Sequence, residues 1–286
     1  MESFSKDKIK KFGNPAAYRE NLLYHMFCDH GKEDLFYQLV FYGLRQDEGI
    51  DMPLNSKYRN LLSRKINYQQ KRIKRISEFI YLTKKPGLWL DMGCGVGQFI
   101  NQIIQSKGNS TVGTETSFNT LKKASFLLNK LSYNKNYCLV NQDSMELPFK
   151  DNAFDYILSA DVIEHVGYDK QKKVISEMYR VLKKGGYVII HTPNLNRVIL
   201  STFFKKIYYL FKGFNPLIIK HSFAGGHISL TTPNRLKTIC RSVGFDARIP
   251  QKNNLKLSCL YKWALAGLSL LFSRSFILIL SKKISC

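Results

Sequence analysis

The chain has 286 residues, with 44 lysines and arginines against 21 aspartates and glutamates and a formal net charge of +23. This length supports one large domain with additions, or one domain and a small helical one. Six cysteines form no C-x-x-C pair, which indicates reduced, buried thiols and excludes a disulfide scaffold. The charge favours an anionic partner, either a membrane surface or a nucleic acid; a generally basic surface is the alternative.

Residues 1–85 carry no cofactor motif and are rich in tyrosine, phenylalanine and lysine. The N-terminal run has no apolar core, so we expect no secretory signal and a cytoplasmic protein. An apolar stripe beside basic residues precedes the first strand and predicts an amphipathic helix. The stripe consists of Ile66, Ile73, Ile76, Phe79 and Ile80. This helical extension either packs against a sheet or covers a binding pocket.

The run LDMGCGVGQF at 90–99 places an acid and three alternating glycines where an apolar strand turns into a helix. Glycine adopts positive φ at low cost and lets backbone N–H groups approach a ligand. The sequence therefore predicts that Asp91, Gly93, Gly95 and Gly97 bind the tail of a nucleotide-like cofactor. Because the spacing differs from Gly-x-Gly-x-x-Gly, NAD is the weaker candidate.

Two further strands each lead to an acid. The strand at 111–115 ends in Glu115, about twenty residues after the glycines, where the hydroxyl pair of a ribose needs an acceptor. Ser117 then caps a helix. The third strand, at 137–140, is followed by Asp143.

Strand and helix patterns continue to alternate through residue 191, with a helix expected to end at Gly185 and Gly186. Such alternation predicts an α/β fold with a parallel sheet, in which ligands bind at the carboxyl ends of the strands. A later helix begins at Thr232 and Pro233 and closes at Gly244. The residues expected at the strand ends are Asp91, Glu115, Asp143, Asp161 and Thr192.

Two segments have more than one interpretation. Residues 195–228 form a long insertion in which aromatic residues alternate with lysines. It is either a basic amphipathic helix in a lipid interface or a lid over the acceptor pocket. The strongly apolar run at 255–280 is either a membrane anchor, or a helix at 257–272 followed by a strand at 276–280 that pairs with 245–249.

These features and the runs LPFKDNAFD, DVIEHV and EMYRVLKKGGYVIIHTPN together resemble a known family over about residues 75–250. The chain is similar to class I S-adenosylmethionine-dependent methyltransferases of the small-molecule type, such as ubiquinone-pathway O-methyltransferases. The resemblance implies a Rossmann-like, doubly wound, mostly parallel seven-stranded sheet with a C-terminal antiparallel hairpin, in a domain at 86–286. In S-adenosylmethionine, Asp91 and the glycines would then hold the methionine part, Glu115 the ribose, and Asp143 with the Ser144 backbone the adenine.

Four side chains are candidates for chemistry on the acceptor: Asp161, Glu164, His165 and His227. In RNA 2′-hydroxyl and ubiquinone-pathway methyltransferases a similar acid-x-x-Glu-His run is linked to a divalent metal, so the resemblance implies a metal held by these four. Such donors suit Mg²⁺, Mn²⁺ or Zn²⁺. Alternatively, His165 is a general base assisted by Asp161, or Glu164 and His165 only hydrogen-bond the loop above the cofactor. We expect His191, inside a strand, to be a satisfied core residue.

Three functions follow as hypotheses. The first is O-methylation of a lipid-like or membrane-delivered small molecule, such as a quinone precursor or a lipid-linked sugar, by a cytoplasmic protein peripheral to the membrane. The second is 2′-hydroxyl methylation of RNA, which the charge and the Glu-His run favour. The third is a non-catalytic scaffold, which the intact cofactor motifs disfavour. The sequence defines neither the acceptor nor the oligomeric state.

Overall fold

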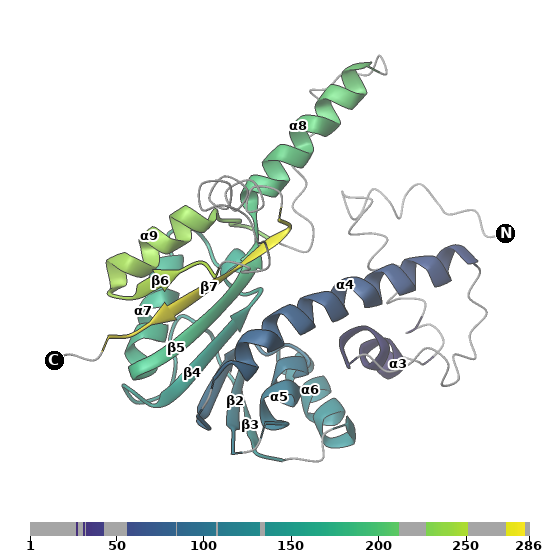
Figure 1. Ribbon diagram of the computed structural model, residues 1–286. Helices are drawn as coiled ribbons and strands as arrows, with labels where there is room; N and C mark the ends of the chain where they lie inside the picture. Colours follow the sequence, from purple (N-terminus) through teal and green to yellow (C-terminus); the bar gives the residue numbers. More distant parts are fainter. Residues whose placement is uncertain are drawn as a thin grey trace, which may run out of the picture.

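The computed structural model describes residues 27, 31, 33–42, 56–83, 85–106, 108–131, 135–211, 227–250 and 273–283. Its centre is a twisted seven-stranded sheet (Figure 1). The strands are β1 (Leu88–Met92), β2 (Ser110–Glu115), β3 (Tyr137–Asn141), β4 (Phe154–Ala160), β5 (Leu182–Pro193), β6 (Asp246–Arg248) and β7 (Ser275–Ser281). The helical segments are α3 (Glu33–Tyr37), η1 (Gln38–Tyr42), α4 (Ser56–Tyr81), α5 (Gln98–Ile104), α6 (Phe118–Leu131), η2 (Ile163–His165), α7 (Gln171–Val181), α8 (Leu195–Phe211) and α9 (Pro233–Val243).

The strands lie in the order β3-β2-β1-β4-β5-β7-β6. All neighbours from β3 to β5 are parallel, whereas β7 is antiparallel to both β5 and β6. The predicted Rossmann-like α/β fold with a C-terminal antiparallel hairpin is therefore confirmed. So is the pairing of the last two strands, in which Ala247 lies opposite Leu280.

The chain starts the sheet in the middle, at β1, and builds outward through β2 and β3 before returning to place β4 on the other side of β1. At such a reversal the connections after the two neighbouring strands leave in opposite directions and open a crevice above their carboxyl ends. The topology therefore predicts the binding site above β1 and β4.

Helices cover both faces of the sheet. On one face, α7 and α9 pack on a core that includes Leu90 and Met92 of β1. On the other face, α4 and α5 pack around Trp89, with α6 beside α5 (Figure 1). Because successive residues of a strand point to opposite faces, Asp91 lies on the same side of β1 as Trp89, toward α4.

Helix α4 connects the N-terminal part of the chain to the sheet. Near its start, Leu62 joins an aromatic-rich cluster with Phe36 of α3. Near its end, Ile73, Ile76 and Ile80 belong to the core cluster around Trp89. The predicted amphipathic helix is thus present and packs on the sheet. The division into 1–85 and 86–286 stays a proposal, and α4 forms extensive apolar contacts across it.

The observed ends of two helices can be compared with the ends predicted from local sequence signals. Helix α9 begins and ends as predicted, with Thr232 Oγ1 accepting from the Arg235 N–H at 3.2 Å and Gly244 at φ 112°. Helix α7, in contrast, ends at Val181 and not at the glycines, because Leu182 already pairs with Phe154 in the sheet. The buried Lys282 amino group, from the far end of the chain, donates 2.8 Å bonds to the carbonyls of Tyr179 and Leu182 there.

The insertion and the C-terminal apolar run are described in part. Helix α8 forms the first half of the insertion, and residues 212–226 lie outside the described residues, as does the helix predicted at 257–272. Since Ser275–Ser281 is strand β7, the end of the apolar run belongs to the sheet and not to a membrane-crossing helix. Among the described residues, no helix combines the length and the apolar character needed to cross a membrane.

Candidate active site

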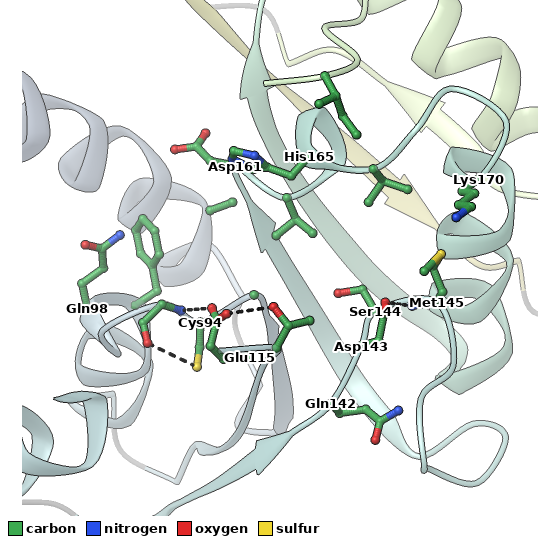
Figure 2. A pocket seen from close by; sticks show the side chains of 18 of the residues that line it. Cys94, Gln98, Glu115, Gln142, Asp143, Ser144, Met145, Asp161, His165 and Lys170 are labelled. Carbon is green, nitrogen blue, oxygen red and sulfur yellow. Dashed lines mark hydrogen bonds between the residues drawn. The ribbon is translucent and has the colours of Figure 1, made fainter. Parts of the chain in front are cut away.

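A cavity of about 650 Å³ lies above the carboxyl ends of β1, β2 and β4. Figure 2 shows side chains from three directions around it. The glycine turn and Glu115 form one side, Asp143 and Ser144 another, and Asp161 and His165 a third. Five predicted cofactor residues and two predicted acceptor residues therefore border one space: Gly93, Gly95, Glu115, Asp143, Ser144, Asp161 and His165. Asp91 and Gly97 are not among the residues that line it.

The turn between β1 and α5 places its glycines in the left-handed region, with φ of 71° at Gly93, 54° at Gly95 and 81° at Gly97. A Cβ on Gly93 would lie 2.4 Å from the Val162 side chain, so the turn packs tightly against the segment after β4. A Cβ on Gly95 would meet no described atom within 4 Å. The side of Gly95 on which a Cβ would lie is therefore open, and Gly95 lines the cavity.

Asp91 is the last residue but one of β1 and is almost fully buried, at 1% exposure. Neither of its carboxylate oxygens has a hydrogen-bond partner within the described part of the chain. Burial raises the pKa of Asp91 to about 7, and the Glu115 carboxylate adds to the rise, while the charge of Arg72 opposes it. A cationic ligand group at this position would satisfy both oxygens and favour the ionised form.

Glu115 ends β2 and links the turn to the next helix. Its Oε2 accepts from the Gly95 N–H at 3.2 Å and its Oε1 accepts from the Ser117 N–H at 3.0 Å. Ser117 in turn caps α6, as predicted, by accepting from the Thr120 N–H at 3.2 Å. The carboxylate is thereby held at the cavity wall.

Asp143 and Ser144 line the opposite wall, after β3. Asp143 Oδ1 accepts from the Met145 N–H at 2.8 Å, which fixes the turn. Ser144 is 8% exposed. The pair faces Glu115 across the cavity (Figure 2).

Asp161, after β4, is a non-glycine residue at positive φ, 60°. One of its oxygens lies 2.6 Å from Arg72 Nη2 and the other 2.7 Å from His191 Nδ1. Loss of solvation raises the pKa of Asp161, but the hydrogen bond with His191 and the Arg72 charge outweigh it and hold this pKa below its ordinary value. Both oxygens of the ionised carboxylate are therefore already engaged.

His191 is 2% exposed, and its second ring nitrogen lies 2.9 Å from Ser275 Oγ. Burial lowers the pKa of His191, so the neutral ring is favoured, and a carboxylate partner requires the proton on Nδ1. The structure thus brings His191 into the core as predicted, and it also places this residue behind Asp161, where it orients the carboxylate.

Glu164, His165 and His227 form a second cluster, with one potential ligand atom from each residue within 4.8 Å of the others. Glu164 is fully buried. Its Oε2 accepts from Thr192 Oγ1 at 3.0 Å, and its Oε1 has no hydrogen-bond donor among the described residues. Burial, helped by the nearby Asp161 charge, raises the pKa of Glu164 to about 8.

The four residues predicted as metal ligands are therefore not all together. Glu164, His165 and His227 converge, with the two imidazole rings 5.1 Å apart, whereas Asp161 is directed toward Arg72 and His191 and is not in the cluster found among the described residues. The positive φ at Asp161 and the ion pair with α4 direct its carboxylate away.

The N-terminal part of the chain supplies cavity residues that sequence reasoning missed. Phe41 of η1 and both Gln69 and Arg72 of α4 line the cavity, and the Tyr42 hydroxyl donates to the Val96 carbonyl at 2.6 Å. The basic face of the predicted α4 helix contained Arg72, but no local pattern distinguished this residue from its neighbours. Its role depends on how α4 lies across the sheet.

Comparison with known proteins agrees with this geometry. Residues 90–190 match a family model described as a methyltransferase domain. An uncharacterised protein of Methanocaldococcus jannaschii is 36% identical over 138 residues, which cover 48% of this chain and 53% of that protein. The sterol 24-C-methyltransferase of Schizosaccharomyces pombe is 34% identical over 103 residues, covering 36% of this chain and 27% of that enzyme. The chain thus spans about half the length, or less, of these curated relatives.

Among solved structures, magnesium protoporphyrin IX methyltransferase from Synechocystis, with bound SAH, has a similar fold. The TM-score is 0.56 at 17% identity, with 92% of this chain and 100% of that chain covered. Residues 90–190 are therefore similar to methyltransferase domains, in agreement with the predicted family and cofactor, and the fold is that of a solved methyltransferase. These relatives do not single out the ubiquinone-pathway enzymes.

Proposed function

We propose that the protein transfers a methyl group from S-adenosylmethionine to a hydroxyl oxygen of a small, lipid-like acceptor. The observation that carries this proposal is the position of His165. It lines the same cavity as Gly95 and Glu115 and belongs to the cluster formed with Glu164 and His227. Through His165, the cavity that holds the cofactor cradle thus borders a polar cluster able to act on an acceptor oxygen.

The residues of the cradle fit S-adenosylmethionine. This cofactor supplies an electrophilic methyl carbon bound to a positively charged sulfur. The two buried Asp91 oxygens, which lack described donors, fit the ammonium group of its methionine part. Gly95 leaves its backbone open, Glu115 fits the ribose hydroxyls, and Asp143 with the backbone at Ser144 fits the adenine.

The Glu164, His165 and His227 cluster fits a divalent cation. Glu164 Oε1 is buried without a described donor, which leaves it available as a ligand. Burial and the adjacent His165 ring lower the pKa of His227 and favour the neutral imidazole that binds metals. One carboxylate and two imidazoles suit Zn²⁺ or Mn²⁺ better than Mg²⁺. Such an ion would supply Lewis acidity toward the acceptor oxygen.

The chain itself aligns the acceptor and assists loss of the hydroxyl proton. Methyl transfer requires the acceptor oxygen to approach in line with the breaking bond, so positioning provides much of the rate. We assign Asp161 to positioning, since Arg72 and His191 already engage its oxygens. If no metal binds, His165 is the general base at the same place, because a metal would occupy the nitrogen lone pair that a base needs.

The lipid-like acceptor class is supported by the sterol methyltransferase among the relatives and by the size of the cavity. A volume of about 650 Å³ accommodates a small molecule beside part of the cofactor. RNA is the second candidate, because the net charge of +23 favours binding to polyanions.

The first test titrates S-adenosylhomocysteine into the folded protein, with EDTA and then with Zn²⁺ or Mn²⁺. Glu164→Gln is expected to keep S-adenosylhomocysteine binding but to lower metal affinity at least about tenfold, as loss of a charged ligand should. Glu146→Gln, an exposed glutamate, is the matched control. Absence of binding by the folded chain would contradict the methyltransferase proposal.

Transfer of labelled methyl groups is then assayed with hydroxylated lipids and with RNA in parallel. Labelling of lipids that requires Zn²⁺ or Mn²⁺ would support the proposal in full. Labelling that survives EDTA but is lost in His165→Asn would assign the general-base role. Labelling of RNA alone would select the second candidate.

A further inference from the structure

Helix α8 presents large apolar side chains to solvent. Figure 1 shows it projecting away from the body of the domain. The exposed fraction is 56% for Phe203, 54% for Phe204, 62% for Leu210 and 86% for Phe211. Isolated exposed apolar residues are ordinary, but a group of them on one projecting helix indicates an interaction surface.

The spacing of these residues gives the helix an apolar face. Ile199, Phe203 and Leu210 are four and then seven residues apart, which places them along one side of a helix. The rings of Phe203 and Phe204 contact each other at 5.8 Å and widen this face. On the side toward the domain, Thr202 is buried. One side of the helix is thus buried at Thr202, and another side exposes apolar residues to solvent.

The charges of the helix define the kind of partner. Helix α8 contains Arg197, Lys205 and Lys206, and the whole insertion at 195–228 has no aspartate or glutamate in its sequence. Helical spacing places Lys206 at the edge of the apolar face and Lys205 on the opposite side. An apolar face with lysines on the polar side is typical of helices that lie in the interface of an anionic membrane. A positively charged helix is a poor fit to a second copy of a chain with a net charge of +23.

We propose that α8 docks the protein on the surface of an anionic lipid bilayer. Phe203, Phe204 and Leu210 enter the boundary between headgroups and acyl chains. Lys205 and Lys206 lie near the lipid phosphates and carboxylates. Docking of this kind combines apolar burial with electrostatic attraction, so both parts are needed for tight binding.

The insertion is rooted at the acceptor side of the active site. At its start, Asn194 forms a bridge with Thr231. At its end, the N–H groups of Ile228 and Ser229 donate to the Glu164 carbonyl at 3.0 and 3.1 Å. A docked α8 would therefore bring the Glu164 cluster close to the lipid surface. Delivery of a lipid-like acceptor by this route rests on the proposed function, whereas docking itself does not.

The experiment measures flotation of the full chain with vesicles of phosphatidylcholine alone and with about 30% phosphatidylserine, a composition that gives a negative surface. We expect binding to the anionic vesicles and its loss as salt rises. Phe203→Ser combined with Phe204→Ser should weaken binding at least about tenfold, because two rings no longer enter the lipid. Lys205→Glu combined with Lys206→Glu should act in the same direction.

Matched controls separate this helix from general surface effects. Phe118→Ser with Phe126→Ser changes two rings on α6 that are 57% and 48% exposed, and Lys172→Glu with Lys173→Glu makes the same charge change on α7. Equal losses in the controls, or no binding by the unaltered chain, would overturn the proposal. So would a stable dimer that only the α8 variants dissociate. Unchanged S-adenosylhomocysteine binding in the α8 variants verifies their fold and keeps the result separate from the methyltransferase test.

Discussion

At the scale of single residues, the buried Asp91 carboxyl group carries a cost in stability and is the residue proposed to bind the methionine part of the cofactor. Its carboxyl group has a pKa of about 7 in the folded protein, against 3.8 for an unperturbed side chain. The folded state therefore binds this proton more tightly than the unfolded state. The free energy of unfolding of the ligand-free protein should fall as pH rises from about 4 to about 7, and the contribution should then stay constant.

Asp91→Asn is expected to remove this penalty and the cofactor binding together. The difference between 3.8 and about 7 sets an upper limit of about 4 kcal/mol for the gain in unfolding free energy at pH 8. Near pH 4 the two proteins should be equally stable. Denaturant unfolding at both pH values checks the sign, and a less stable variant at pH 8 would contradict it. In the unaltered chain, S-adenosylhomocysteine affinity should rise as pH passes through 7, because Asp91 ionises there. Asp91→Asn should show no such rise.

At the scale of elements, the turn between β1 and α5 needs glycine for two different reasons. All three glycines have positive φ, but Gly93 packs on Val162 and Gly95 is open to the cavity. The first glycine serves the packing of the turn against the segment after β4. The second keeps the backbone accessible to a ligand.

Substitution by alanine should separate these two roles. Gly95→Ala is expected to cost about 1–2 kcal/mol of stability for the left-handed conformation alone, while its methyl group blocks cofactor binding. Gly93→Ala should destabilise more, because its Cβ would also lie 2.4 Å from Val162. Thermal unfolding and titration with S-adenosylhomocysteine measure both effects. Equal destabilisation by the two changes would show that packing at Gly93 is unimportant.

At the scale of the whole molecule, helix α4 connects the apolar cluster of the N-terminal part to the core of the sheet. Ile73, Ile76 and Ile80 of α4 are at most 6% exposed and pack with Trp89. Arg72, from the same helix, holds Asp161 at the cavity. Helix α4 therefore contributes both to the stability of the sheet and to the geometry of the site.

Truncation should reveal this dependence. A chain that begins at Gly87 loses the three isoleucines, each worth about 1.5–3 kcal/mol, out of a total stability of about 5–15 kcal/mol for a typical domain. We expect it to show no cooperative unfolding transition. A chain that begins at Ser56 keeps α4 and should unfold cooperatively. Cooperative unfolding of the shorter chain would instead support an independent domain from residue 86.

The positions in the fold of the residues proposed for the cofactor side could be predicted from the sequence. Asp91 and Glu115 lie at the ends of strands, and the three glycines and Asp143 follow strands within a few residues, so local pattern and strand order were enough to place them. The end of α7 could not be predicted, because Lys282 and the pairing of Leu182 with Phe154 decide it from a distance.

The sequence by itself determined the α/β fold and the place of the glycine turn, because strand–helix alternation and glycine spacing are local signals with a fixed physical meaning. The tertiary structure decided the acceptor side. Arg72 meets Asp161, His191 meets Ser275, and His227 meets Glu164 only through contacts between distant segments. The direction of the Asp161 carboxylate depends on these contacts, and no spacing along the chain encodes it.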